Sequence, residues 1–254
     1  MSASENESTT PGIQAELERL RSLAAEGSEE AMQTIARALR KLGPKLAEVV
    51  PSTRFDVVLF DVGGVMLTNG WDHNERAVVL QQFNLDKAAF EARHPEPYDA
   101  LERDTISMLD YLNATVFYEP RPFTPDDFIS AIKVQSKPIS SNAMGVIGEI
   151  AASNRWLVGL LNNESRLLHE YRMEKYGLKQ HLDVQLSSCY LGMRKPDADI
   201  YRRAIDILGR PPERIIFIDD RKGNTDAAAA AGIHAIQFLG EDKLRFDLQQ
   251  IGIL

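Results

Sequence analysis

The stretch Phe55-Asp56-Val57-Val58-Leu59-Phe60-Asp61-Val62-Gly63-Gly64-Val65 decides the fold class of this chain. Its apolar residues run on without a polar break after Asp56, which is typical of a strand buried on both faces in a parallel sheet covered by helices. Asp61 follows directly, and ligands in such folds bind beyond the carboxyl ends of the strands. The two glycines let backbone approach whatever Asp61 contacts, which suits an anion or a metal. An Asp in this place is also a common helix cap, and both interpretations stay open at this point.

Four later stretches have strand character and alternate with helical sequence. They are residues 156–161, 183–188, 214–218 and 234–238. Alternation of strand and helix at this spacing predicts right-handed βαβ units. The expected fold class is α/β, with a doubly wound, Rossmann-like parallel sheet formed by residues 51–70 and 139–254.

The remaining segments are predicted to be helical or disordered. Residues 71–138 contain several helical stretches and no convincing strand, so we expect a helical cap inserted after the first strand. Residues 13–50 carry apolar side chains at helical spacing and predict an N-terminal helical extension, which packs on its own core or forms a dimer or partner surface. Residues 1–12 are almost entirely polar and are expected to be a disordered tail.

Composition excludes several classes of partner. The net charge of -8 argues against nucleic acid, because phosphate backbones demand a clustered excess of Lys and Arg. Cys189 is the sole cysteine, so the chain can form neither an internal disulfide nor a cysteine-based zinc site. No apolar run is long enough to span a membrane, and the N-terminus is polar and acidic. We therefore expect a cytoplasmic protein with no membrane partner.

A second apolar run, Ile215 to Ile218, ends in the carboxylates Asp219 and Asp220. If this strand neighbours the first, these two groups and Asp61 converge, and three ionised carboxylates within a few Å repel one another by several kcal/mol. A Mg²⁺ ion would offset that repulsion, since it takes oxygen ligands and usually works with a substrate phosphate. In the competing interpretation Asp219 caps the next helix and Asp220 is solvated. Lys195, held before Pro196 in the first turn of a helix, supplies a positive charge for a carboxylate and a phosphate oxygen.

The order of these motifs closely resembles the haloacid dehalogenase-like hydrolase superfamily. The motifs are Asp61-Val-Gly-Gly-Val, Leu160-Leu161-Asn162-Asn163, Gly192-Met193-Arg194-Lys195-Pro196-Asp197 and Phe217-Ile218-Asp219-Asp220-Arg-Lys-Gly-Asn224. The third and fourth are similar to the branch of small bacterial sugar-phosphate phosphatases of the glucose-1-phosphatase type. The resemblance covers residues 55–239.

The resemblance implies an Mg²⁺-dependent phosphatase acting on a small phosphate monoester, such as a sugar phosphate, through an aspartyl-phosphate on Asp61. It implies that catalysis depends on Asp61, Lys195 and Asn162, and that the metal is held by Asp61, Gly63, Asp219, Asp220 and Asn224. The substrate-binding residues that it implies are Gly64, Asn162, Asn163, Arg194 and Lys195. The cap would select the leaving group. Glu102, Arg103 and Asp104 could contact a sugar there, although we favour a solvated helix end.

Two positions depart from the family pattern. Most phosphatases of the superfamily have a second Asp, a general acid and base, where this chain has Gly63, although the glucose-1-phosphatase-like branch also resembles this chain in that respect. The Ser or Thr that usually ends the second-motif strand is replaced by Leu161, which cannot donate a hydrogen bond to a phosphoryl oxygen.

These departures leave open a slow phosphatase and, as the alternative, a weak or inactive protein that binds phosphate or a protein. A halide-removing enzyme is disfavoured by Gly63, and a signalling receiver domain by the order of the acidic residues and the lysine. The expected partners are a small phosphorylated metabolite and, through the cap or the N-terminal helices, a second copy of the chain.

Overall fold

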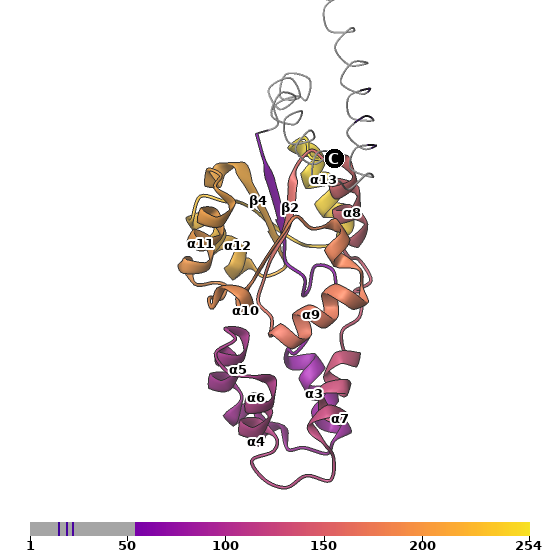
Figure 1. Ribbon diagram of the computed structural model, residues 1–254, viewed down its shortest axis with the longest axis vertical. Coiled ribbons are helices and arrows are strands. Elements are labelled where there is room, and N and C mark those ends of the chain that lie inside the picture. The colour runs from indigo at the N-terminus through magenta and orange to yellow at the C-terminus, as the bar shows by residue number, and fades with distance from the viewer. Residues whose placement is uncertain (1–14, 16–18, 20–21, 23–53) are drawn as a thin grey trace, which may run out of the picture. The chain divides into compact units, whose positions relative to one another are not determined.

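The computed structural model describes residues 54–254 together with Ala15, Arg19 and Ser22, which lie in helix. The chain divides into two compact units, Met1–Arg54 and Phe55–Leu254. The predicted tail and nearly all of the predicted helical extension lie outside the described residues. All of the described strands belong to the second unit (Figure 1).

The sheet of this unit has five parallel strands in the order β3-β2-β1-β4-β5. The strands are β1 (Val57–Phe60), β2 (Leu157–Asn162), β3 (Val184–Ser187), β4 (Ile215–Asp219) and β5 (His234–Gln237). The chain therefore winds outward from β1 in one direction through β2 and β3, and then in the other through β4 and β5. The predicted α/β class with a doubly wound parallel sheet is confirmed.

Side chains of β1 alternate between two apolar layers, which explains its unbroken apolar sequence. Val58 and Phe60 pack in a core with α8 (Met144–Ser153) and α13 (Glu241–Gln250). Val57 and Leu59 pack in a second core on the other face, with α11 (Ala198–Leu208) and α12 (Lys222–Ala230). Figure 1 shows these helix pairs on opposite sides of the sheet.

The five helices that follow β1, α3 to α7, have a core of their own, built around Trp71, Phe90, Tyr111 and Phe128. They fall within the predicted cap, residues 71–138, and lie beyond the carboxyl end of β1 (Figure 1). Their bounds are α3 (His73–Gln82), α4 (Lys87–Arg93), α5 (Pro95–Glu102), α6 (Met108–Thr115) and α7 (Pro125–Val134).

Two linkers join these cap helices to the sheet, and they run side by side. The Thr68 N–H donates to the Lys137 carbonyl at 2.8 Å, and the Thr68 hydroxyl donates to the Gln135 carbonyl at 2.7 Å. Arg172, on α9 (Arg166–Lys175), donates to the carbonyl of Thr68 and to the hydroxyl of Ser136. One guanidinium group thus binds both linkers.

Two predicted boundaries were wrong in ways that affect the site. The helix after Lys195 begins at Ala198 with Asp197 as its N-cap, so Pro196 precedes the helix instead of occupying its first turn. A turn in which the Asp197 N–H donates to the Arg194 carbonyl at 3.0 Å takes the place of that helical turn. The second-motif strand runs through Asn162 and not only to Leu161, because its parallel pairing with β3 extends to the Asn162–Ser187 pair.

Among residues 54–254, no helix combines the length and the apolar character that crossing a membrane would require.

Candidate active site

Three carboxylates meet at the carboxyl edge of the sheet. Phe60 at the end of β1 lies opposite Ile218 of β4, so Asp61 and Asp219 leave the sheet at the same level. One oxygen each of Asp61, Asp219 and Asp220 lies within 4.8 Å of the others. The convergence expected from two acid-ended strands is present, because parallel neighbours end at the same edge.

The Lys195 ammonium group lies between two of these carboxylates. Its Nζ is 3.1 Å from Asp61 Oδ1 and 2.5 Å from Asp219 Oδ2, and the side chain is only 1% exposed. Asn163 fixes the lysine backbone from both sides: the Lys195 N–H donates to Asn163 Oδ1, and Asn163 Nδ2 donates to the Lys195 carbonyl, each at 2.8 Å. The second and third sequence motifs therefore contact each other, and together they aim Lys195 at Asp61.

Both carboxylate oxygens of Asp219 accept hydrogen bonds from other residues of the protein. Besides Lys195, Asn224 Nδ2 donates to both oxygens at 3.0 Å, and the Arg221 N–H donates to Oδ1 at 2.8 Å. The side chain has no exposed surface. The resemblance implies that Asp219 and Asn224 are metal ligands. In the structure Asn224 donates to Asp219, and Asp219 accepts from the Lys195 ammonium group and so holds it in place.

Asp220 is placed differently from Asp219. Its Oδ1 is buried and accepts no hydrogen bond from any described residue. Gly64, with φ of +69°, packs directly against the Asp220 carboxylate, and a Cβ on Gly64 would overlap with it. A buried oxygen without a donor is costly unless a cation or a donor satisfies it.

Burial and mutual repulsion govern the acidity of this cluster. Desolvation raises the pKa of Asp61 to about 7; the Asp219 carboxylate adds to the rise and Lys195 opposes it. Desolvation, followed by the charge of Asp219, also raises the pKa of Asp220. The cluster contains three carboxyl groups and one ammonium group, so a divalent cation would balance its excess negative charge. This donor set of buried carboxylate oxygens fits Mg²⁺.

A cavity of about 390 Å³ lies next to the cluster, between the sheet and the cap helices. Its walls carry both signs of charge, which suits a polar, anionic ligand better than an apolar one. Its lining includes Asp61, Gly63, Asn69, Asp72, Glu102, Asn163, Glu164, Arg172, Arg194 and Arg221.

The interpretation of Leu161 as a lost phosphate donor is wrong. Its side chain is fully buried in the apolar core between the sheet and α11, on the same face as Leu59. The strand ends one residue later, at Asn162, and the residue that follows this strand end and contacts Lys195 is Asn163. Asn162 is 1% exposed and does not line the cavity; its Nδ2 is 3.5 Å from His169 Nδ1.

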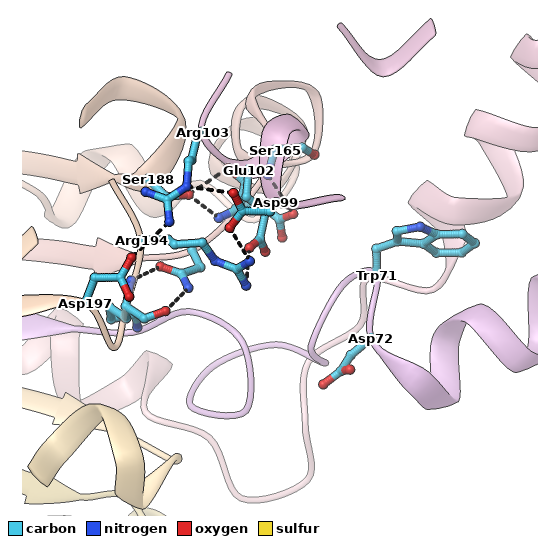
Figure 2. A network of polar contacts seen from close by, with 12 residues as sticks. Trp71, Asp72, Asp99, Glu102, Arg103, Ser165, Ser188, Arg194 and Asp197 are labelled. Carbon is cyan, nitrogen blue, oxygen red and sulfur yellow. Dashed lines mark hydrogen bonds and ion pairs between the residues drawn. The ribbon is translucent and has the colours of Figure 1, made fainter. Parts of the chain in front are cut away.

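Arg194, expected to bind substrate, lines the cavity and also contacts the cap. Its guanidinium lies 2.9 Å from Asp99 Oδ1 and 2.7 Å from Glu102 Oε2, both on α5 (Figure 2). The expected solvated end of this helix was wrong for Glu102, whose side chain is 5% exposed. The neighbouring Arg103 and Asp104 also bind the core, through Asp197 at 2.9 Å and Arg166 at 2.6 Å.

Sequence reasoning missed the cavity residues Asn69, Asp72, Glu164, Arg172 and Arg221. Arg221 pairs with Asp72, the N-cap of α3, at 2.5 Å, and this pair joins the cap to the loop after β4. Glu164 Oε2 pairs with Arg172 Nη1 at 3.0 Å in a nearly inaccessible site. The only available signal was proximity to a motif: Glu164 follows Asn163, and Arg221 follows Asp220.

Known proteins with similar sequences or folds point to one family. The chain is 38% identical over 80 residues to flavin mononucleotide hydrolase 1 of Arabidopsis thaliana, covering 32% of this chain and 33% of that protein. It is 39% identical over 62 residues to a GMP/IMP nucleotidase of Escherichia coli, covering 24% of this chain and 28% of that protein. The matched segments thus span a third or less of these relatives' length.

The fold resembles a crystal structure of an HAD family enzyme from Bacteroides thetaiotaomicron, with a TM-score of 0.66 at 16% identity, over 76% of this chain and 98% of that one. Another structure of that enzyme, in complex with magnesium and inorganic phosphate, matches with a TM-score of 0.59 at 16% identity, over 72% and 93% of the two chains. The haloacid dehalogenase-like hydrolase family model matches residues 55–232, more than half of the sequence. The chain belongs to the haloacid dehalogenase-like hydrolase family.

Proposed function

We propose that the chain is a phosphatase that hydrolyses a small phosphate monoester, with Mg²⁺ as cofactor and Asp61 as nucleophile. The observation that carries the proposal is the pairing of Asp61 Oδ1 with the buried Lys195 ammonium at 3.1 Å, next to the unpartnered oxygen of Asp220. A carboxylate held beside a fixed cation at a cavity floor can attack phosphorus in line and leave an aspartyl-phosphate, which water then hydrolyses.

Each side chain of the cluster has a separate task in this proposal. Lys195 opposes the rise in the pKa of Asp61 that burial causes, and it stabilises the charge on the phosphoryl oxygens. Asp219 and Asn224 hold Lys195 in place, and Asn163 positions its backbone. Asp61, Asp220 and the carbonyl of Gly63 would hold Mg²⁺. When bound, the ion neutralises the carboxylates and the phosphate and polarises the phosphoryl group.

Two further observations support a phosphate ester as substrate. Flavin mononucleotide, GMP and IMP, the compounds in the names of two relatives, are phosphate monoesters. The cavity of about 390 Å³ accommodates a small leaving group beyond the phosphate. The single cysteine, Cys189, is a buried free thiol, which supports the further proposal of a reducing, cytoplasmic location.

The alternative of an inactive binding module depended on Leu161 as a missing donor. That support is removed, because Leu161 belongs to the apolar core and Asn162 and Asn163 follow it at the strand end. The arrangement of Asp61, Lys195 and Asp220 favours a phosphatase over a binding module.

The test is release of inorganic phosphate from a panel of sugar phosphates and nucleotides, with Mg²⁺ and with a chelator, beside Asp61→Asn. We expect release that depends on Mg²⁺ and falls to background in Asp61→Asn. Equal release by the variant and the unaltered protein would refute the role of Asp61.

A further inference from the structure

The two linkers between the sheet and the cap helices determine where the cap lies over the cavity. They are residues 68–70, which lead into α3, and residues 135–137, which follow α7. Besides the contacts given above, the Lys137 N–H donates to the Thr68 hydroxyl at 3.2 Å. The two linkers are thus hydrogen-bonded to each other, and whatever holds this pair fixes the position of the cap.

Arg172 holds the pair of linkers. It is on α9, which Figure 1 shows at the junction of the sheet and the cap helices. Its Nε donates to the Ser136 hydroxyl at 3.1 Å, and its Nη2 donates to the Thr68 carbonyl. Its Nη1 lies 3.0 Å from Glu164 Oε2, and the side chain is 2% exposed. A guanidinium group offers five donors in one rigid plane, so it can hold two linkers and a carboxylate in a fixed arrangement, which an ammonium group on a flexible stem cannot do.

Glu164 anchors Arg172 to the wall of the cavity. Its Oε1 accepts from the Ser165 N–H at 3.1 Å, and its own N–H donates to the Ser188 hydroxyl at 3.0 Å. The first linker lies directly against this ion pair: a Cβ on Gly70, whose φ is +69°, would lie 2.8 Å from Glu164 Oε2 and 2.9 Å from Arg172 Nη2. The contact leaves no space for a side chain on Gly70, so the position of the linker depends on that of the guanidinium group.

The position of the cap matters to the part of a substrate beyond its phosphate. In an in-line displacement the leaving group is on the far side of phosphorus from the nucleophile. Asp61 lies at the sheet edge, and Tyr98 and Glu102 of α5 line the cavity from the cap (Figure 1). A shift of about 1 Å in the groups that orient a substrate can cost about 10²-fold in rate, even when the altered residue is far from the chemistry.

We propose that Arg172 is a positioning residue of this hydrolase: by holding both linkers against the cavity wall, it places the cap where α5 contacts the leaving group. This inference rests on the proposed phosphatase function. Arg172 lines the cavity, but its Nε, Nη1 and Nη2 each have a partner in the protein, so it acts through the cap and not on the reacting atoms. Its effect should therefore grow with the size of the leaving group.

Two probes whose leaving groups depart without a proton separate this role from a general loss of structure. The acetate of acetyl phosphate is small, whereas the nitrophenolate of p-nitrophenyl phosphate extends toward the cap. Arg172→Lys keeps a positive charge beside Glu164 but loses the fork that spans both linkers. We expect it to lower kcat/KM for p-nitrophenyl phosphate about 10–10²-fold and that for acetyl phosphate less than about threefold. The ratio of the two values on one preparation does not depend on the fraction of folded protein.

Ser136→Ala removes the acceptor in the second linker without changing a charge, and it should shift this ratio in the same direction by a few-fold. Arg214→Lys is the matched control, because it alters another paired arginine, whose partner Asp56 precedes β1 at the opposite end of the sheet. It should change both probes by the same factor. An equal loss on both probes in Arg172→Lys, or a selective loss in Arg214→Lys, would overturn the assignment.

Hydrogen exchange tests the same contacts without any substrate. In Arg172→Lys the amide hydrogens of residues 68–70 and 135–137 should gain in exchange rate at least about tenfold more than those of β1, whose exchange reports global unfolding. An equal gain in the linkers and in β1 would show a general loss of stability and would overturn the proposal. If the unaltered protein hydrolysed neither probe, the phosphatase proposal itself would fail, whereas the exchange rates would still decide whether Arg172 holds the linkers.

Discussion

Gly64 provides a sharp test of how Asp220 is placed, because it combines a left-handed backbone with direct contact with the Asp220 carboxylate. Gly64→Ala should lower the free energy of unfolding by about 1–2 kcal/mol through the strain of a positive φ alone. The added methyl group must also displace the Asp220 carboxylate. We expect this displacement to weaken Mg²⁺ binding at least about tenfold, as changes next to metal ligands typically do.

Gly209→Ala is the matched control, since Gly209 has φ of +60° at the end of α11 with nothing within 4 Å of its Cβ position. Urea unfolding with and without Mg²⁺, at 100 times the dissociation constant of the unaltered protein, measures both effects. The ion should stabilise the unaltered protein and Gly209→Ala by about 2.7 kcal/mol, and Gly64→Ala by about 1.4 kcal/mol or less. Full stabilisation of Gly64→Ala by Mg²⁺ would refute the placement of Asp220 at the metal.

Three further predictions concern the core, the linkers and pH. Leu161→Thr should lower the free energy of unfolding by about 1–3 kcal/mol in urea, since it buries an unpaired hydroxyl, and should not speed phosphate release; faster release would mean that this side chain does reach the phosphate. Arg172→Met leaves Glu164 buried without its partner and should cost about 3–5 kcal/mol, with partial recovery when Glu164→Gln is added; equal stability of the single and double variants would contradict the pairing. In the metal-free protein the pKa of Asp61, raised from 3.8 to about 7, makes the folded chain bind a proton that the unfolded chain has already released, so stability should fall as pH rises between these values. The thermal shift produced by Mg²⁺ should therefore be larger at pH 8 than at pH 5, and equal shifts would count against this reasoning.

The sequence predicted those parts of the site that follow from strand ends. The apolar runs before Asp61 and Asp219 are buried on both faces, and parallel neighbours must end at one edge, so the acidic cluster could be derived without coordinates. Lys195 was identified from its position between two acid-ended strands in the sequence and before a helix expected to start at Pro196, although that helix begins at Ala198.

Two other parts of the site could not be predicted from the sequence: the residues at the end of β2, and the residues that the cap helices bring to the cavity. In the run Leu160-Leu161-Asn162-Asn163 the apolar pattern does not fix where the strand ends. Placing the strand end one residue too early made Leu161, a core residue, look like a residue of the site. Glu102 begins the charged stretch Glu102-Arg103-Asp104, which predicts a helix end exposed to solvent. In the structure it is buried and pairs with Arg194, a contact that joins segments far apart in the sequence.

The most direct test of the central claim is a crystal structure with Mg²⁺ and beryllium fluoride, a mimic of the phosphoryl group. We expect the ion about 2.0–2.1 Å from oxygens of Asp61 and Asp220 and from the Gly63 carbonyl, with the fluoride on Asp61 and in contact with Lys195 Nζ. An ion bound to Asp219 instead of Asp220, or a fluoride group away from Asp61, would contradict the account.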